Sequence, residues 1–189
     1  MKTTAQRWYI KFLQWKTQYL THRQFILLLC ALVGVATGFA ALAMRSLTHF
    51  IEEVLVGNII RYINYGFYIV FPAVGFLLVY LVKKYVIRKD VSHGIPSILY
   101  AVAKQKGIMK RFQAYGSLLT APITIGFGGS VGLEGPMVVT GAGISSQIAR
   151  LFHINQSDRM LLLACACAAA LAAIFKVPLA GSLFAIEIF

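Results

Sequence analysis

The sequence predicts an all-α membrane protein whose transmembrane helices are broken and tilted. Of its 189 residues, 59% are hydrophobic and only 13% are charged, whereas about a quarter of an ordinary soluble domain is charged. The mean hydropathy is +0.74, and several long stretches carry no charge at all. This composition excludes the disordered, collagen-like and disulfide-scaffold classes.

The net charge of +12 comes from 18 Lys and Arg residues against 6 Asp and Glu residues. The basic residues flank the apolar runs, which is typical of cytoplasmic loops in membrane proteins. Membrane topology is a sufficient cause of this charge, although an anion pathway would also favour it. We therefore expect no nucleic-acid partner and predict a multi-pass protein of a bacterial-type inner or plasma membrane.

Residues 1–23 contain aromatic and basic residues but no acid, a pattern that predicts an amphipathic helix on the cytoplasmic leaflet. Residues 24–189 then form the transmembrane domain. Its first charge-free run, Gln24–Met44, is long enough for one bilayer crossing. A signal peptide is the alternative, because residues 41–43 resemble a cleavage site, but its apolar core usually has only about 7–15 residues.

A second charge-free run, Tyr62–Val82, is followed by a cluster of basic residues. The basic ends of the two runs lie before the first crossing and after the second, and therefore on the same side of the membrane. The positive-inside rule places that side, and the N-terminus with it, in the cytoplasm.

The segment between Arg111 and Arg150 contains one charged residue, Glu134, and half of the protein's 16 glycines lie within residues 116–143. One straight helix of this length would overshoot the hydrocarbon core, and two full crossings would fit poorly. We therefore predict two helices separated by non-helical backbone at membrane depth. Such backbone is tolerated where protein or a watery cavity satisfies its polar groups.

A further apolar run, Met160–Phe175, ends at a Lys-Val-Pro sequence, and a new apolar segment continues to Phe189. We expect these 189 residues to be the front part of a longer protein. The cysteines all lie inside apolar runs without metal-binding spacing, so we interpret them as packing residues and predict no metal and no cofactor. They are Cys30, Cys165 and Cys167.

Two segments combine glycines with a proline that suits the first turn of a helix. They are S-H-G-I-P at 92–96 and G-L-E-G-P at 132–136. Each helix N-terminus carries about half a positive charge. Two of them converging on one point inside the membrane would bind a small anion and still release it, as broken helices do in transporters.

Glu134 is the strongest single candidate for a functional residue, because a carboxylate at membrane depth usually marks an ion or proton path. Charged, it would occupy the anion site; protonated, it would leave. The alternative is a carboxylate that caps the helix and has no transport role. His93 either bonds local backbone or lines the anion path, and the Ser92 hydroxyl has the same two interpretations.

The glycine cluster lacks the G-K-[ST] ending and the spacing of nucleotide-binding loops. Gly141 and Gly143 are better explained as small residues that permit close helix packing in a membrane. No Ser/His/Asp arrangement is evident, and no second titratable group accompanies Glu134 in its segment. We therefore predict that the protein is not an enzyme.

The two motifs, together with the segment 172–187, resemble the CLC family of chloride channels and proton/chloride exchangers. That family carries the motifs GSGIP and G(K/R)EGP. The resemblance runs from about Gln24 to Phe189. It implies the N-terminal half of an inverted-repeat CLC-type fold, with an anion pathway in each subunit of a homodimer, chloride as the anion and protons as a second substrate in exchangers.

The resemblance also implies roles for individual residues. Glu134 matches the gating glutamate, and His93 stands where the family's anion-coordinating serine usually stands. The residues that would lie beside the anion are Ser92, His93, Gly94, Ile95, Gly132, Leu133 and Gly135.

Several departures from the family pattern leave alternatives open. Ser92 and His93 replace Gly and Ser, which leaves chloride and other small anions as candidates, and Leu133 replaces a basic residue. Ile188 stands at the position that the internal proton-transfer glutamate occupies in exchangers, and Glu187 is one residue away. A channel and an exchanger therefore both remain possible. An alternative of another class is a non-transporting helical membrane module that acts as an assembly partner.

Overall fold

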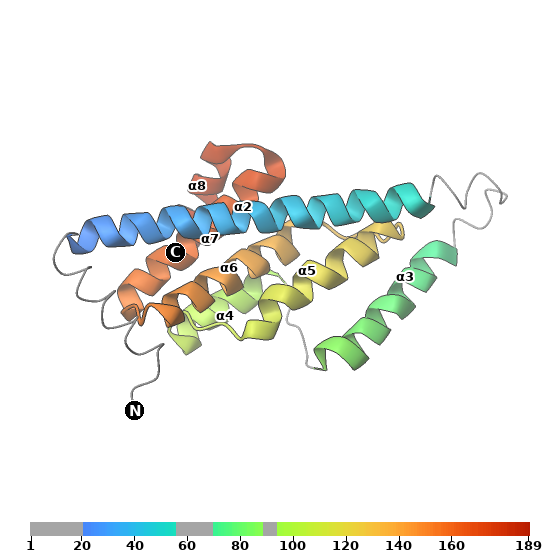
Figure 1. The fold of residues 1–189 in the computed structure, drawn as a ribbon, viewed down its shortest axis with the longest axis horizontal. Helices are drawn as coiled ribbons and strands as arrows, with labels where there is room; N and C mark the ends of the chain where they lie inside the picture. Colours follow the sequence, from blue (N-terminus) through green and yellow to red (C-terminus); the bar gives the residue numbers. More distant parts are fainter. Residues whose placement is uncertain (1–20, 56–69, 89–93) are drawn as a thin grey trace, which may run out of the picture.

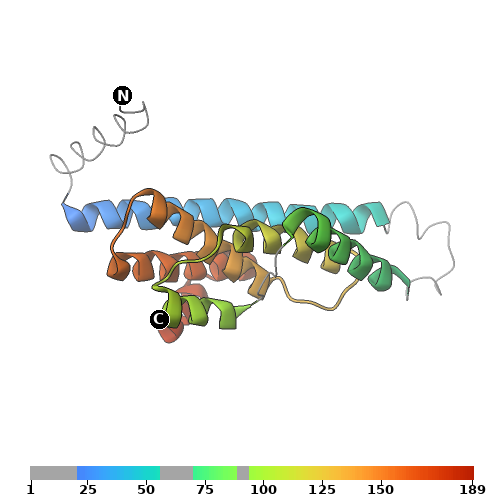
Figure 2. The same cartoon turned by 90° about the horizontal axis from the view of Figure 1, so that it is seen from below.

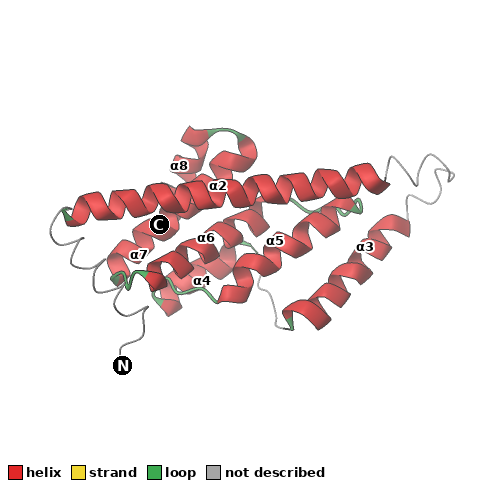
Figure 3. Ribbon diagram, viewed as in Figure 1, coloured by secondary structure: helices red, strands yellow, loops and turns green. Residues whose placement is uncertain are grey.

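The computed structural model describes residues 21–55, 70–88 and 94–189, which are helical with no strand among them (Figure 3). The all-α prediction is confirmed. The cytoplasmic helix predicted for residues 1–23 lies almost entirely outside the described residues. The elements are α2 (His22–Leu55), α3 (Val70–Leu81), the π-helix η3 (Val82–Ile87), α4 (Ile95–Gln105), α5 (Arg111–Gly126), α6 (Glu134–Leu151), α7 (Gln156–Phe175) and α8 (Pro178–Ile188).

Three described helical segments are long and apolar enough to cross a membrane: α2, the stretch Val70–Ile87, and α7. Helix α2 continues well beyond the predicted crossing at Gln24–Met44. Its 34 residues span about 51 Å at roughly 1.5 Å per residue, more than the ~30 Å of hydrocarbon. Arg45 and the residues after it favour a helix as strongly as the apolar run does. The helix therefore continues beyond the end of the charge-free run.

The predicted break between Arg111 and Arg150 is confirmed. Helix α5 ends at Gly126, residues 127–133 are not helical, and α6 begins at Glu134. The backbone N–H of Gly129 donates to the carbonyl of Thr124 at 2.8 Å, which satisfies one of the last carbonyls of α5. This bond keeps the chain turned back against the end of α5 before it leaves toward α6.

Helix α2 runs along most of the length of the described fold, and α5, α6 and α7 pack against it (Figures 1 and 2). Helix α4 packs on α6, α8 packs on α7, and α3 lies beside α5. Helices α4 and α6, which begin at the two motifs of the sequence, therefore touch each other within a frame provided by α2 and α7.

Two clusters of buried apolar side chains form the core. The larger joins α2, α4, α6 and α7 and includes Met44, Ile98, Met137 and Leu163, each at most 1% exposed. The smaller packs the start of α2, from Phe25 to Val33, against the end of α6 and the first part of α7. Because the larger cluster lies directly behind the starts of α4 and α6, it fixes where those starts lie.

Small residues let the helices approach closely, as predicted for Gly141 and Gly143. A Cβ on Gly143 would lie 2.6 Å from Cβ of Ala114 in α5. A Cβ on Gly141 would lie 2.9 Å from a methyl of Thr37 in α2. Both distances are shorter than van der Waals contact, so only glycine permits α6 to lie at this depth between α2 and α5.

Polar contacts tie the connections to the bundle. Arg159 donates from one guanidinium nitrogen to the carbonyl of Lys106 at 3.2 Å and from the other to that of Ile154 at 3.0 Å. The buried amide of Met109 donates to the Ser146 hydroxyl at 2.8 Å. These bonds hold the far end of α4 and the linker after it against α6 and α7.

Candidate anion site

The start of α4 is set by Gly94, whose backbone has φ +83° and ψ −178°. This conformation is one that residues with a side chain rarely adopt. The Gly94 carbonyl accepts from the Ser97 amide at 3.2 Å and from the Ser97 hydroxyl at 2.8 Å. Pro96 lies in the first turn, as predicted. Because Pro96 has no N–H and the Ser97 amide donates to Gly94, the Ile95 amide is the donor of this first turn that is left for a group in front of the helix.

The start of α6 is built in a similar way. Leu133 precedes the helix, Glu134 is its first residue, and Pro136 lies in the first turn. The Met137 amide donates to the Leu133 carbonyl at 3.0 Å, which closes that turn. The amides of Glu134 and Gly135 come before the first intrahelical bond and have no helical partner.

The two helix starts touch each other. A Cβ on Gly135 would lie 3.4 Å from Cα of Gly94. The structure thus brings together two motifs that are some forty residues apart in the chain. Gly94, Ile95, Leu133, Glu134 and Gly135 all belong to this junction, while Gly132 lies in the loop that leads to it. Ser92 and His93 lie outside the described residues.

The Glu134 side chain is exposed among the described residues. It turns back toward its own loop, since a Cβ on Gly132 would lie 3.0 Å from its Oε2. The absence of a side chain at Gly132 gives the carboxylate room to lie there.

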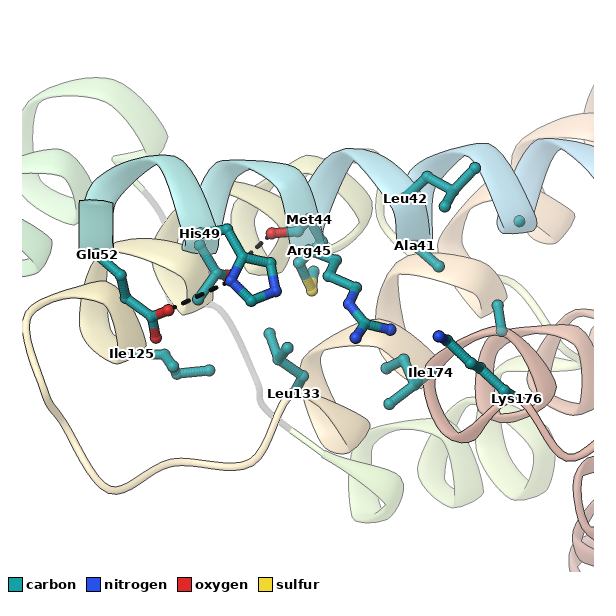
Figure 4. Close-up of a pocket in the computed structure, with 13 residues that line it drawn as sticks. Ala41, Leu42, Met44, Arg45, His49, Glu52, Ile125, Leu133, Ile174 and Lys176 are labelled. Carbon is teal, nitrogen blue, oxygen red and sulfur yellow. Dashed lines mark hydrogen bonds and ion pairs between the residues drawn. The ribbon is translucent and has the colours of Figure 1, made fainter. Parts of the chain in front are cut away.

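Each helix start adjoins a pocket. Leu133 lines a pocket of about 600 Å³ beneath the second half of α2 (Figure 4). Pro96 and Ser97 line a second pocket of about 320 Å³ between α4 and α5. The start of α6 therefore borders the larger pocket, and the start of α4 borders the smaller one.

The larger pocket contains charged side chains that the sequence analysis did not single out. Arg45 and His49 come from α2, and Lys176 from the turn between α7 and α8. The sequence did hold a signal for two of them. Arg45 is the only Lys, Arg, Asp or Glu between Arg23 and Glu52, and Lys176 the only one between Arg159 and Glu187.

No group of three His, Cys, Asp or Glu side chains suited to a metal occurs within residues 21–55, 70–88 and 94–189. The three cysteines are free thiols. The chemistry of the junction is therefore that of backbone amides, one carboxylate and nearby cations.

Comparison with known proteins places this chain in a family. The family described as voltage gated chloride channel matches residues 74–189. The chain is 31% identical over 169 residues to the H(+)/Cl(-) exchange transporter ClcA of Citrobacter koseri. It is 29% identical over 169 residues to ClcA of Salmonella arizonae. Each match covers 86% of this chain but 36% of the relative, so the chain spans about a third of the relatives' length.

The matched segment makes up more than half of the chain and contains both helix starts. The sequence resemblance to the CLC family is thereby confirmed. The chain belongs to the voltage-gated chloride channel family.

Proposed function

We propose that the protein moves chloride or another small anion across a membrane, that the starts of α4 and α6 bind the anion, and that Glu134 is a protonatable gate. The observation that carries this proposal is the contact between Gly94 and Gly135. Two helix starts that meet beside the apolar core create a positive potential without a positive side chain.

The strength of that potential follows from simple electrostatics. Half a positive charge at about 4 Å, in an effective dielectric near 20, attracts a monovalent anion by roughly 2 kcal/mol. Two helix starts together supply about twice that. An interaction of this size offsets part of the cost of dehydrating the anion and is weak enough to release it, which is what a pathway requires.

Glu134 suits the gating role because it is the first residue of α6. Its carboxylate competes with an anion for the same amides when charged, and vacates them when protonated. The exposed side chain has room for both positions. The capping alternative predicts that protonation changes the stability of α6 but leaves the pathway unaltered, so flux measurements separate the two.

The proposal covers passive conduction and proton-coupled exchange alike. The two ClcA relatives are exchangers by name. In this chain, Ile188 occupies the position that the family resemblance gives to an internal proton-transfer glutamate. The two modes differ in whether a chloride gradient drives protons uphill. We propose no enzymatic role, in keeping with relatives that are named as transporters.

The setting that we propose is a bacterial inner or plasma membrane, with the N-terminus in the cytoplasm and two copies of the full-length protein forming a homodimer. The described residues support the orientation through charge. Arg23 lies at the start of α2, and Lys83, Lys84 and Arg88 lie at the end of the second crossing. Lipid surrounds the apolar faces of α2 and α3, which expose large side chains such as Phe39.

The test uses the native full-length protein reconstituted in liposomes, with chloride efflux measured by electrode between pH 4.5 and 7.5. We expect the parent to change rate with pH and Glu134→Gln to lose that dependence. Glu53→Gln is the matched control, because Glu53 is an exposed acid on α2 outside the junction. It should behave as the parent does.

Two outcomes would count against the proposal. Flux whose pH dependence survives in Glu134→Gln would remove the gating role. No anion flux from the full-length parent would favour the non-transporting membrane module. Proton uptake recorded in the same experiment, with chloride flowing down its gradient, assigns the exchanger or the channel mode.

A further inference from the structure

The larger pocket gathers two cations that come from distant parts of the chain. Arg45 lies in the second half of α2, and Lys176 directly follows the last residue of α7. Both side chains point into the pocket in Figure 4. Neither makes an ion pair or hydrogen bond within the described residues.

Two like charges that point into one pocket repel each other unless something of opposite sign is there. Each is also the sole ionisable Lys, Arg, Asp or Glu of a long apolar stretch, and such isolated charges in membrane segments usually mark ion pathways. The contacts of the described residues give no structural reason for retaining Arg45 and Lys176. An anion in the pocket gives both cations a partner.

The acid in the pocket does not fill this role. Glu52 is the one carboxylate that lines it, and its Oε2 lies 3.4 Å from Nδ1 of His49 on the same helix (Figure 4). The carboxylate is thus directed along α2 toward His49. The formal charges of Arg45, Lys176 and Glu52 leave a net charge of +1 on the pocket wall.

We propose that this pocket is a separate binding site for a small inorganic anion, held by Arg45 and Lys176, from which the anion passes to the start of α6. Leu133, the residue before α6, forms part of the pocket wall, so the site adjoins the helix start directly. This inference rests on the proposed function and adds to it a second site outside the two motifs.

The size of the pocket determines how much water an anion keeps inside it. A volume of about 600 Å³ is room for roughly twenty water molecules at about 30 Å³ each. A halide therefore keeps most of its water here and loses it only at the junction of the helix starts. Long cationic side chains suit such a site, because they raise the local anion concentration without dehydrating the ion.

A fluorophore placed in the pocket tests the site without any transport. Leu42 lines the pocket and is 63% exposed, so Leu42→Trp in the full-length protein reports on quenching by iodide, after subtraction of the signal of the parent's own tryptophans. Adding Arg45→Gln or Lys176→Gln should lower the iodide quenching constant about two- to threefold each, as expected for a unit charge about 8 Å away in water. Both together should lower it about fivefold or more.

Neutral acrylamide controls for the shape of the pocket, since its quenching should stay unchanged in every variant. Arg23→Gln is the matched control for charge. Arg23 lies on the same helix as Arg45 and about 33 Å from it, at roughly 1.5 Å per residue. Equal iodide quenching in Arg45→Gln, Lys176→Gln and the parent would overturn the site. So would an equal loss in Arg23→Gln, which would show a diffuse field in place of a site.

Chloride flux then tests the link to transport. The KM for chloride at constant ionic strength should rise about two- to threefold for each Gln variant, equally in vesicles of zwitterionic lipid and in vesicles with anionic lipid. A rise confined to one lipid composition would assign the pocket to a lipid phosphate and refute the proposal. If the parent moves no chloride, the proposed function fails, and the iodide measurement still decides whether the anion site exists.

Discussion

Gly94→Ala tests the geometry on which the anion site depends. The backbone of Gly94 has φ +83° and ψ −178°, and a residue with a side chain in such a conformation costs about 1–3 kcal/mol. The added methyl group would meet only Cδ of Pro96 at 3.6 Å, an ordinary contact. The whole cost therefore comes from the backbone conformation, and none from crowding.

Gly34→Ala is the matched control. Gly34 lies inside α2, and a Cβ there would meet nothing within 4 Å. The same substitution should stabilise the protein by about 0.5–1 kcal/mol, because alanine loses less backbone entropy in a helix than glycine does. The two variants differ by one methyl group each from the parent and are expected to change stability in opposite directions.

The assay is reversible unfolding of the purified full-length protein in mixed micelles, followed by circular dichroism. The free energy of unfolding should differ by about 1.5–4 kcal/mol between the two variants, which is the sum of the two expected effects. Chloride binding should weaken in Gly94→Ala alone, since only that change turns the start of α4. A Gly94→Ala protein with the parent's stability and chloride affinity would refute the reasoning.

Two further predictions concern the packing that holds the junction in place. Gly143→Ala would bring a Cβ within 2.6 Å of Cβ of Ala114, so it should destabilise the protein by about 1–3 kcal/mol through overpacking; Ala114→Gly in the same chain should restore part of the loss in the unfolding assay. Arg159→Gln removes charged hydrogen bonds to the carbonyls of Lys106 and Ile154 and should cost about 1.5–3 kcal/mol. Unchanged amide hydrogen exchange at the end of α4 would contradict the role of Arg159.

The break in the middle of the chain was predictable because it depends on local backbone preferences. A charge-poor stretch that is too long for one crossing, is rich in glycine and contains Pro136 leaves few alternatives to two helices with a loop between them. The same holds for the end of α7, where Lys176 and Pro178 stop the helix at the expected place. Helix α2 was harder to delimit, because charged residues after Met44 favour a helix too.

The candidate site residues differ in how far the sequence alone indicated their roles. Glu134 stood out in the sequence because it is the lone charge of its segment, and the structure places it at the first position of α6. Arg45 and Lys176 carry the same signal, yet their significance depends on their sharing a pocket. That relation joins residues more than a hundred positions apart, and no local pattern encodes it.

The sequence by itself determined the class of protein, the breaks in its helices and the motifs of its family, because hydrophobic length and the preferences of glycine and proline act between near neighbours. Only the tertiary structure decided that Gly94 touches Gly135 and that two isolated cations line one pocket beside Leu133. Those contacts follow from the depth at which α6 packs between α2 and α5, which is set by the shapes of side chains distant in the chain.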